Sequence, residues 1–169
     1  MSKLTLYNGI VVDLLTVRYT DSNNVEQAIK TMRLWRNDLE REDVEKPFLF
    51  PAVFIEFLPS AFMESASKGY QTVDMTVRLH ICFESYKDED TDILALTQAV
   101  YSKLQLKSYG TWGAMKRRNE EQNFDHTNVQ DYIQDYSVAQ GKDFYADQRP
   151  STDAQVDTIT VTPEIGITT

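Results

Sequence analysis

Few residues in this chain belong to the types that carry out catalysis or bind metal ions. The sequence has two histidines, His80 and His126, and one cysteine, Cys82. A cysteine nucleophile needs a neighbouring base and an oxyanion donor, and no pattern around Cys82 points to either. The chain also lacks a glycine-rich phosphate loop, a Gly-x-Ser-x-Gly elbow and a His-Glu-x-x-His pair. We therefore expect structural or surface roles for these three residues, with no catalytic residue, metal ligand, cofactor or enzymatic activity.

The acidic run Asp88–Asp92 is a further candidate for metal binding. A calcium loop of the EF-hand type needs a central glycine and a distant bidentate glutamate, and this run has neither. The run precedes an apolar pattern with helical spacing. This position favours a solvated loop that caps a helix, with Asp90 or Thr91 as the N-cap.

The overall charge limits the classes of partner. The chain carries 26 acidic and 17 basic residues, for a net charge of -9. This balance argues against a general binder of nucleic acid or anionic membranes, because both require a positive surface. The basic patch Lys116–Arg118 is a local exception that suits an acidic partner. A single cysteine excludes an intrachain disulfide and favours a reducing compartment. We expect a soluble protein, since the sequence shows no signal-peptide pattern and no apolar run of roughly 20 residues.

The clearest structural signal is a strict alternation between Thr72 and Ser85. Its apolar positions are Val73, Met75, Val77, Leu79, Ile81 and Phe83. The even positions between them include Thr76, Arg78 and His80, which we expect on the opposite face. A period of two predicts a β-strand with one buried face. About thirteen residues at about 3.3 Å each give a strand of roughly 40 Å, about twice the common length.

Weaker patterns predict the elements around this strand. Apolar residues at helical spacing indicate helices at Leu4–Val17 and Ile93–Leu104. In the first helix the predicted stripe consists of Leu6, Ile10, Leu14 and Val17, widened by Tyr7, Val11 and Leu15. Further strands are predicted at Ile29–Trp35, Ala52–Leu58 and Val156–Val161.

Val129–Ala139 fits a strand or a helix almost equally well. We favour two paired strands, Ala114–Phe124 and Val129–Ala139, joined by a turn at Asp125–Asn128. Together the patterns predict an α+β fold, with a mainly antiparallel sheet of long strands. We place one domain at residues 1–147 and a C-terminal linker with a strand or tail extension at residues 148–169.

Two loops are candidates for contacts with other proteins. Phe62 and Met63 lie in the middle of the Pro59–Gly69 connection, where they either fold back onto the sheet or form an interface. The loop Asp38–Lys46 is highly charged, and the basic patch lies elsewhere in the chain. The candidate interface residues are Phe62, Met63, Glu64, Glu40, Glu42, Asp43, Arg117 and Arg118.

The order and spacing of these segments resemble the tail terminator, or tail-completion, proteins of long-tailed phages. The segments that carry the resemblance are Met32–Asn37, the charged loop, Pro47–Phe57, Gln71–Glu84, Ile93–Leu104 and Asp125–Asn128. The resemblance covers roughly residues 3 to 140.

The resemblance implies a small α+β domain whose two helices pack on one face of the sheet. It also implies a homo-oligomeric ring, commonly a hexamer, in the neck of the virion. Such a ring is assembled in the host cytoplasm, stops tail-tube growth and joins the tube to the head-neck connector. DNA passes through it without specific binding, and it uses no cofactor and catalyses no reaction. A head-closure, tail-tube or injection-system cap subunit would fit the same pattern. A small ligand-binding regulatory module, with a pocket between the helix Ile93–Leu104 and the sheet, is the alternative from another class.

Overall fold

The computed structural model describes residues 3–37, 39, 48–59, 62–64, 71–84, 90–123 and 129–138, and for residues 62–64, 71, 72 and 90 it describes the backbone alone. The predicted strand Val156–Val161, the predicted turn Asp125–Asn128 and most of the loop Asp38–Lys46 lie outside these residues. The elements are α1 (Lys3–Leu14), β1 (Arg18–Thr20), β2 (Glu26–Ala28), β3 (Thr31–Leu34), β4 (Ala52–Phe57), β5 (Phe62–Glu64), β6 (Gln71–Val73), β7 (Met75–Glu84), α2 (Asp90–Leu104), β8 (Met115–Asn123) and β9 (Val129–Val138).

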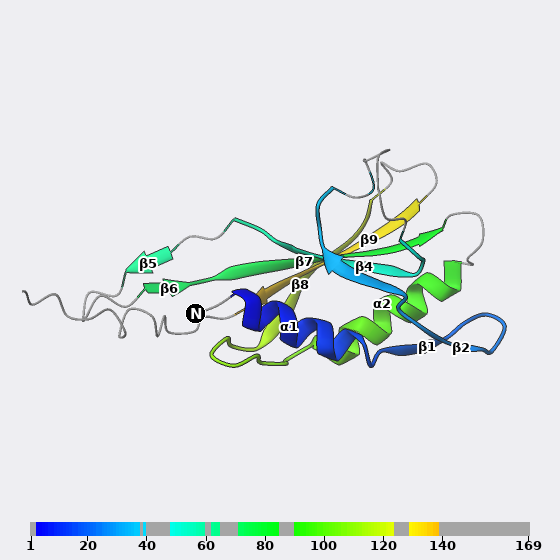
Figure 1. The fold of residues 1–169 in the computed structure, drawn as a ribbon, viewed down its shortest axis with the longest axis horizontal. Coiled ribbons are helices and arrows are strands. Elements are labelled where there is room, and N and C mark those ends of the chain that lie inside the picture. The colour runs from blue at the N-terminus through cyan, green and yellow to red at the C-terminus, as the bar shows by residue number, and fades with distance from the viewer. Residues whose placement is uncertain are drawn as a thin grey trace, which may run out of the picture.

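A five-stranded sheet organises the fold, in the order β3-β4-β7-β9-β8. Its strands pair antiparallel except for β3 and β4, which run parallel. Helices α1 and α2 lie on the same side of this sheet (Figure 1). The α+β class predicted from the sequence, with a mainly antiparallel sheet and two helices on one face, is confirmed.

The central strand β7 buries the face that its alternation predicts. All six apolar positions from Val73 to Phe83 are at most 5% exposed and belong to the main core. The predicted strand is nevertheless interrupted at Asp74, which is exposed and separates β6 from β7. The alternation continues across the break, so the pattern alone does not reveal it.

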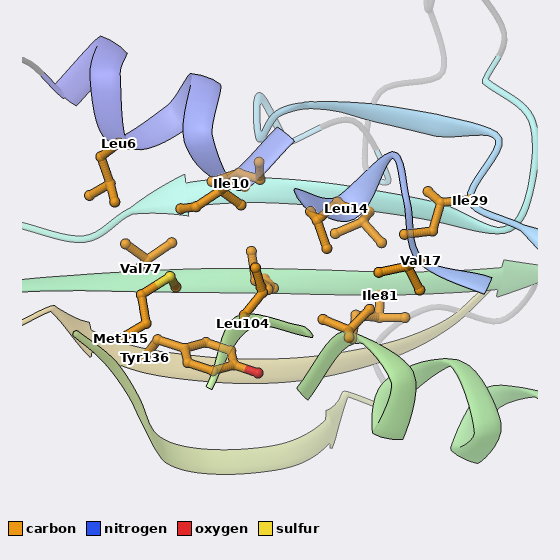
Figure 2. Packing of buried hydrophobic residues seen from close by; sticks show 14 of the residues in the cluster. Leu6, Ile10, Leu14, Val17, Ile29, Val77, Ile81, Leu104, Met115 and Tyr136 are labelled. Atoms are coloured by element: carbon orange, nitrogen blue, oxygen red, sulfur yellow. The ribbon is translucent and has the colours of Figure 1, made fainter. Parts of the chain in front are cut away.

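The main core lies between the sheet and the two helices. The α1 residues Leu6, Ile10 and Leu14 point toward Val77 and Ile81 of β7 (Figure 2). Helix α2 adds Ile93, Leu96, Val100 and Leu104 to the same cluster. Fully burying an aliphatic side chain of this size contributes about 1.5–3 kcal/mol, so this layer supplies most of the driving force for folding.

The segment Val129–Ala139, whose pattern fits a strand or a helix almost equally well, forms strand β9 (Val129–Val138). β9 pairs with β7 along its whole length, from Met75↔Val138 to Glu84↔Val129, and with β8 on its other side. The preference for two paired strands is therefore confirmed. Gln134 lies on the core face, where Thr97 O and Glu120 Oε1 accept hydrogen bonds from its amide and Tyr136 donates one to its carbonyl. These bonds satisfy a fully buried polar side chain.

Helix α1 ends earlier than the pattern predicts. The helix stops at Leu14, and Val17 reaches the core from the following turn. Leu15 was predicted to widen the buried stripe, but its side chain is 54% exposed. Residues 21–25 form the tip of the β1–β2 hairpin. There the Asp21 carboxylate accepts hydrogen bonds from the backbone N–H groups of Asn23 and Val25. These bonds lower the pKa of Asp21, chiefly through Val25.

Candidate functional site

A two-stranded arm extends the β4–β7 pair beyond the main sheet. β5 pairs antiparallel with β6, with Phe62 opposite Val73 and Glu64 opposite Gln71. Among the described residues, β9 extends as far as Val138, opposite Met75, and the arm lies beyond this position. Figure 1 shows the arm projecting away from the helices and sheet. The prediction of a simple loop at Pro59–Gly69 is therefore wrong for Phe62, Met63 and Glu64, because their backbone is part of a strand.

The predicted charged interface residues divide into two groups. Glu40, Glu42 and Asp43 lie outside the described residues. Arg117 and Arg118 lie at a β-bulge in the edge strand β8. The bulge turns two consecutive basic side chains to different neighbours.

The Arg117 side chain interacts with residues of its own chain. Its guanidinium lies 3.9 Å from the ring centroid of Tyr101 and makes a 2.8 Å ion pair with Glu120. Arg118 instead donates a 2.8 Å hydrogen bond to the Ser137 hydroxyl and remains exposed. Of the two predicted interface arginines, Arg118 is thus the better placed to meet another molecule.

The outer side of α1 carries exposed apolar residues, and two of them, Leu4 and Val12, lie outside the stripe that the sequence pattern predicts. Leu4 and Val12 are 63% and 62% exposed, and Leu15 at the helix end is similarly exposed. The exposed side of α1 therefore carries apolar side chains among polar ones such as Thr5 and Asn8. Exposed apolar residues that lie close together are typical of a surface that contacts another molecule.

A shallow, open groove runs between the end of α1 and helix α2. It is lined by Thr16, Val17, Arg18, Ala99, Ser102 and Lys103. The regulatory-module hypothesis expected a pocket between α2 and the sheet, whereas this groove lies between α2 and the α1–β1 connection. Its open shape provides little enclosure for a small ligand.

The second face of the sheet holds a compact polar and aromatic network. His80 Nδ1 lies 3.0 Å from Asp131 Oδ2, and His80 Nε2 lies 3.3 Å from Glu56 Oε2. The indole of Trp35 stacks on the His80 ring, with 4.0 Å between centroids and 8° between planes. The prediction that His80 lies on the face opposite the main core is confirmed, but the expectation of one buried face is wrong at His80 and Cys82, which are 5% and 0% exposed.

Aromatic residues from distant segments cover this end of the second face. A small second cluster contains Ala52, Phe54 and Cys82, with Trp35, Phe48 and Phe50 packed against it. The sequence reasoning missed the roles of Trp35, Glu56 and Asp131. A usable signal was the apolar Phe54 and Cys82 at positions that otherwise alternate as the polar side of their strands.

The network contains a cysteine, a histidine and a carboxylate, as cysteine-dependent active sites do, but Cys82 bonds to the carboxylate of Asp131 and not to His80. Cys82 Sγ donates to Asp131 Oδ1 at 3.7 Å. Burial, followed by the charge and hydrogen bond of Asp131, raises the pKa of the Cys82 thiol well above its ordinary value. A thiol held protonated beside a carboxylate is a poor nucleophile, so the described contacts give Cys82 a structural role.

Next to the network, Arg78 makes a two-pronged ion pair with Asp135, at 2.8 Å and 3.1 Å. The hydrogen bond that Arg78 donates to Asp135 raises the pKa of Arg78. Within the described ranges, no group of three or more His, Cys, Asp or Glu residues is arranged to hold a metal ion. Among those same ranges, none of the helices has the length and apolar character needed to cross a bilayer.

Comparison of the chain with known protein families and with curated proteins finds no match.

Proposed function

We propose that this chain is a structural subunit that assembles into a ring, and that the ring is the tail terminator of a long-tailed phage or a related neck component. The proposal joins the resemblance of residues 3–140 to one structural observation, the β5–β6 arm that projects past the end of β9. In this role the protein catalyses no reaction and acts through its surfaces.

The arm supports assembly because an isolated two-stranded hairpin is at best marginally stable in water. Its base is tied to the core through Val73, which is 5% exposed, but β5 and β6 form a sheet separate from the main one. Contact with a neighbouring molecule would supply the packing that a third strand supplies elsewhere. The arm sequence includes Phe62 and Met63, two residue types that are enriched in protein interfaces.

A ring also requires a second, different surface on the same chain. A heterologous contact that closes on itself generates a ring, whereas identical patches generate a two-fold dimer. The exposed apolar residues Leu4, Val12 and Leu15 and the exposed arginine Arg118 provide surfaces distinct from the arm. Exposed ion pairs contribute about 0–1 kcal/mol each, so apolar contacts would dominate the affinity and charges would set orientation.

The test is negative-stain electron microscopy and sedimentation velocity of the wild-type protein and the double variant Phe62→Ser/Met63→Ser, each with and without tail-tube protein. We expect the wild type to form rings with a central hole and to bind the end of the tube. The double variant should stay folded by circular dichroism and fail to assemble. Leu94→Ser is the matched control, since Leu94 is a 55% exposed leucine on α2.

Two results would count against the proposal. One is a wild-type protein that remains monomeric in the presence of the tube protein. The other is a double variant that assembles as well as Leu94→Ser, which would remove the arm from the interface. A stable monomer that binds a metabolite would favour the regulatory-module alternative instead.

A further inference from the structure

A network centred on His80 spans the second face of the main sheet, from Trp35 directly after β3 to Asn123 of β8. His80 of β7 lies between Glu56 of β4 and Asp131 of β9. The side chain of Asn123 of β8 donates to Asp131 at 3.4 Å. Trp35, directly after β3, covers the imidazole. The network therefore crosses the sheet from edge to edge in the order of its strands.

His80 has a carboxylate next to each ring nitrogen, Asp131 at Nδ1 and Glu56 at Nε2. If both contacts are hydrogen bonds, the number of protons on the ring follows. Ionised carboxylates only accept hydrogen bonds, so each ring nitrogen must carry a proton to donate to its neighbour. Asp131 is 0% exposed, and a buried carboxylate is costly without a positive partner. A doubly protonated His80 is the arrangement that satisfies Asp131 and Glu56 together.

The remaining ionisable groups around the network are already engaged. Cys82, beside His80 on β7, donates to Asp131. Arg78, on the other side of His80 along β7, is paired with Asp135, and Glu121 of β8 contributes to the field at that arginine. The guanidinium of Arg33 from β3 lies 5.4 Å from the ring centroids of Phe48 and Phe54. His80 is thus the basic side chain in direct contact with Asp131, with 3.0 Å between Nδ1 and Oδ2.

The two contacts of His80 differ in how easily they are released. Asp131 is fully buried and also bonded to Cys82 and Asn123, whereas the Glu56 side chain is 31% exposed and can turn toward water. If the imidazole loses one proton, we expect the proton on Nδ1, which bonds to Asp131, to remain. Nε2 then presents a lone pair to the Glu56 carboxylate, which repels it, and a neutral ring attracts the indole of Trp35 less than a cation does.

We propose that His80 is a proton-linked clasp, which holds Glu56 and Trp35 against the second sheet face while it carries two protons and loosens both when it loses the proton on Nε2. The position of the Trp35 indole, directly after β3, would thereby depend on pH through His80. Trp35 also donates its backbone N–H to Ile55 O at 2.9 Å, so loosening concerns the indole before the strand. This inference is independent of the proposed ring and goes beyond it.

The test is nitrogen-15 NMR of the histidine ring in a His126→Ala background, which leaves His80 as the only histidine in the chain. In a pH series we expect both nitrogens to be protonated at the acid end. With rising pH the Nε2 proton should be lost and the Nδ1 proton kept. The indole N–H signal of Trp35 should move with the same midpoint, while that of Trp112 stays in place.

Glu56→Gln separates a clasp from a histidine that is merely buried. Removing the charge next to Nε2 should lower the midpoint, because a neighbouring carboxylate favours the protonated imidazole. Glu26→Gln, a change at an exposed glutamate on β2, is the matched control and should leave the midpoint unchanged. If Glu56→Gln does not fold, Glu56→Asp should shift the midpoint in the same direction by less.

Three outcomes would overturn the proposal. One is a neutral His80 with a single ring proton throughout the pH series. Another is an equal midpoint in Glu56→Gln and Glu26→Gln. The last is a Trp35 indole signal that does not follow the histidine.

Discussion

The ring of Tyr109 lies directly against Gly9, so close that a Cβ on this glycine would collide with it. The same tyrosine donates a 2.8 Å hydrogen bond to the Asp13 carboxylate, one turn farther along α1. Lys103 and Lys107 lie 3.8 Å and 3.9 Å from that carboxylate. The segment that follows α2 is therefore fastened to α1 by a contact that requires a glycine inside a helix.

Gly9→Ala should destabilise the protein, although alanine is the better helix former. In an ordinary helix interior this change gains about 1 kcal/mol. Here the added Cβ must displace the Tyr109 ring, and overpacking of this kind costs about 1–3 kcal/mol. We expect a net loss in the free energy of unfolding, measured by urea titration. Asn8→Ala, at an exposed neighbour on the same helix, should be neutral or slightly stabilising, and a Gly9→Ala protein that matches it would disprove the close contact.

Val77→Asp tests the face that β7 buries. Val77 is 0% exposed in the main core, and an unpaired carboxylate there costs several kcal/mol, comparable with the stability of a whole domain. The variant should be unfolded by circular dichroism and by NMR. Thr76→Asp places the same charge one residue earlier on the opposite, half-exposed face and should leave the fold intact. A register shift of one residue would reverse the two results.

The parts of the fold that the sequence predicts well are those in which local pattern and burial agree. The alternation around Val77 predicts both the strand and its buried face, because a two-residue period has few other structural explanations. The ends of elements are less certain. Leu15 continues the apolar spacing of α1 and its N–H still donates to Val11 O, but the chain turns directly after it, as the hydrogen bond from Val17 N to Leu14 O shows. The exposed position of Leu15 follows from where α1 sits on the sheet.

Local pattern signals a buried second sheet face only through Phe54 and Cys82, and it does not reveal the network around His80. His80 occupies a polar position on its strand, and what buries it is Trp35, which is 45 residues earlier in the chain and is brought over by the parallel pairing of β3 with β4. Asp131 reaches it from the other side through the pairing of β7 with β9. For the candidate interface, residue types drew attention to Phe62 and Arg118. The alternation does not signal the break at Asp74, which separates the arm strand β6 from β7.

The pKa of Cys82 leads to a prediction at alkaline pH. Burial raises this pKa in the folded state, while an unfolded chain has an ordinary thiol with a pKa of about 8.5. The folded protein therefore holds its thiol proton at pH values where the unfolded chain releases it. The contribution of Cys82 to the free energy of unfolding is therefore fully present below about pH 8.5. It is lost as the pH rises above about 8.5, by at most about 1.4 kcal/mol per pH unit.

Cys82→Ser isolates this contribution, since serine can still donate a hydrogen bond to Asp131 and does not ionise in the same range. Burial also raises the pKa values of Tyr109 and Tyr136, but an unfolded tyrosine ionises only near pH 10. Between about pH 8.5 and 10 the free energy of unfolding should fall faster in the wild type than in Cys82→Ser, while below this window the two curves should run parallel. Urea titrations at several pH values give the curves, and reaction of the native thiol with an aromatic disulfide reagent provides an independent check. Parallel curves throughout, or a native Cys82 that reacts as fast as the denatured one, would show that the folded protein does not protect the thiol.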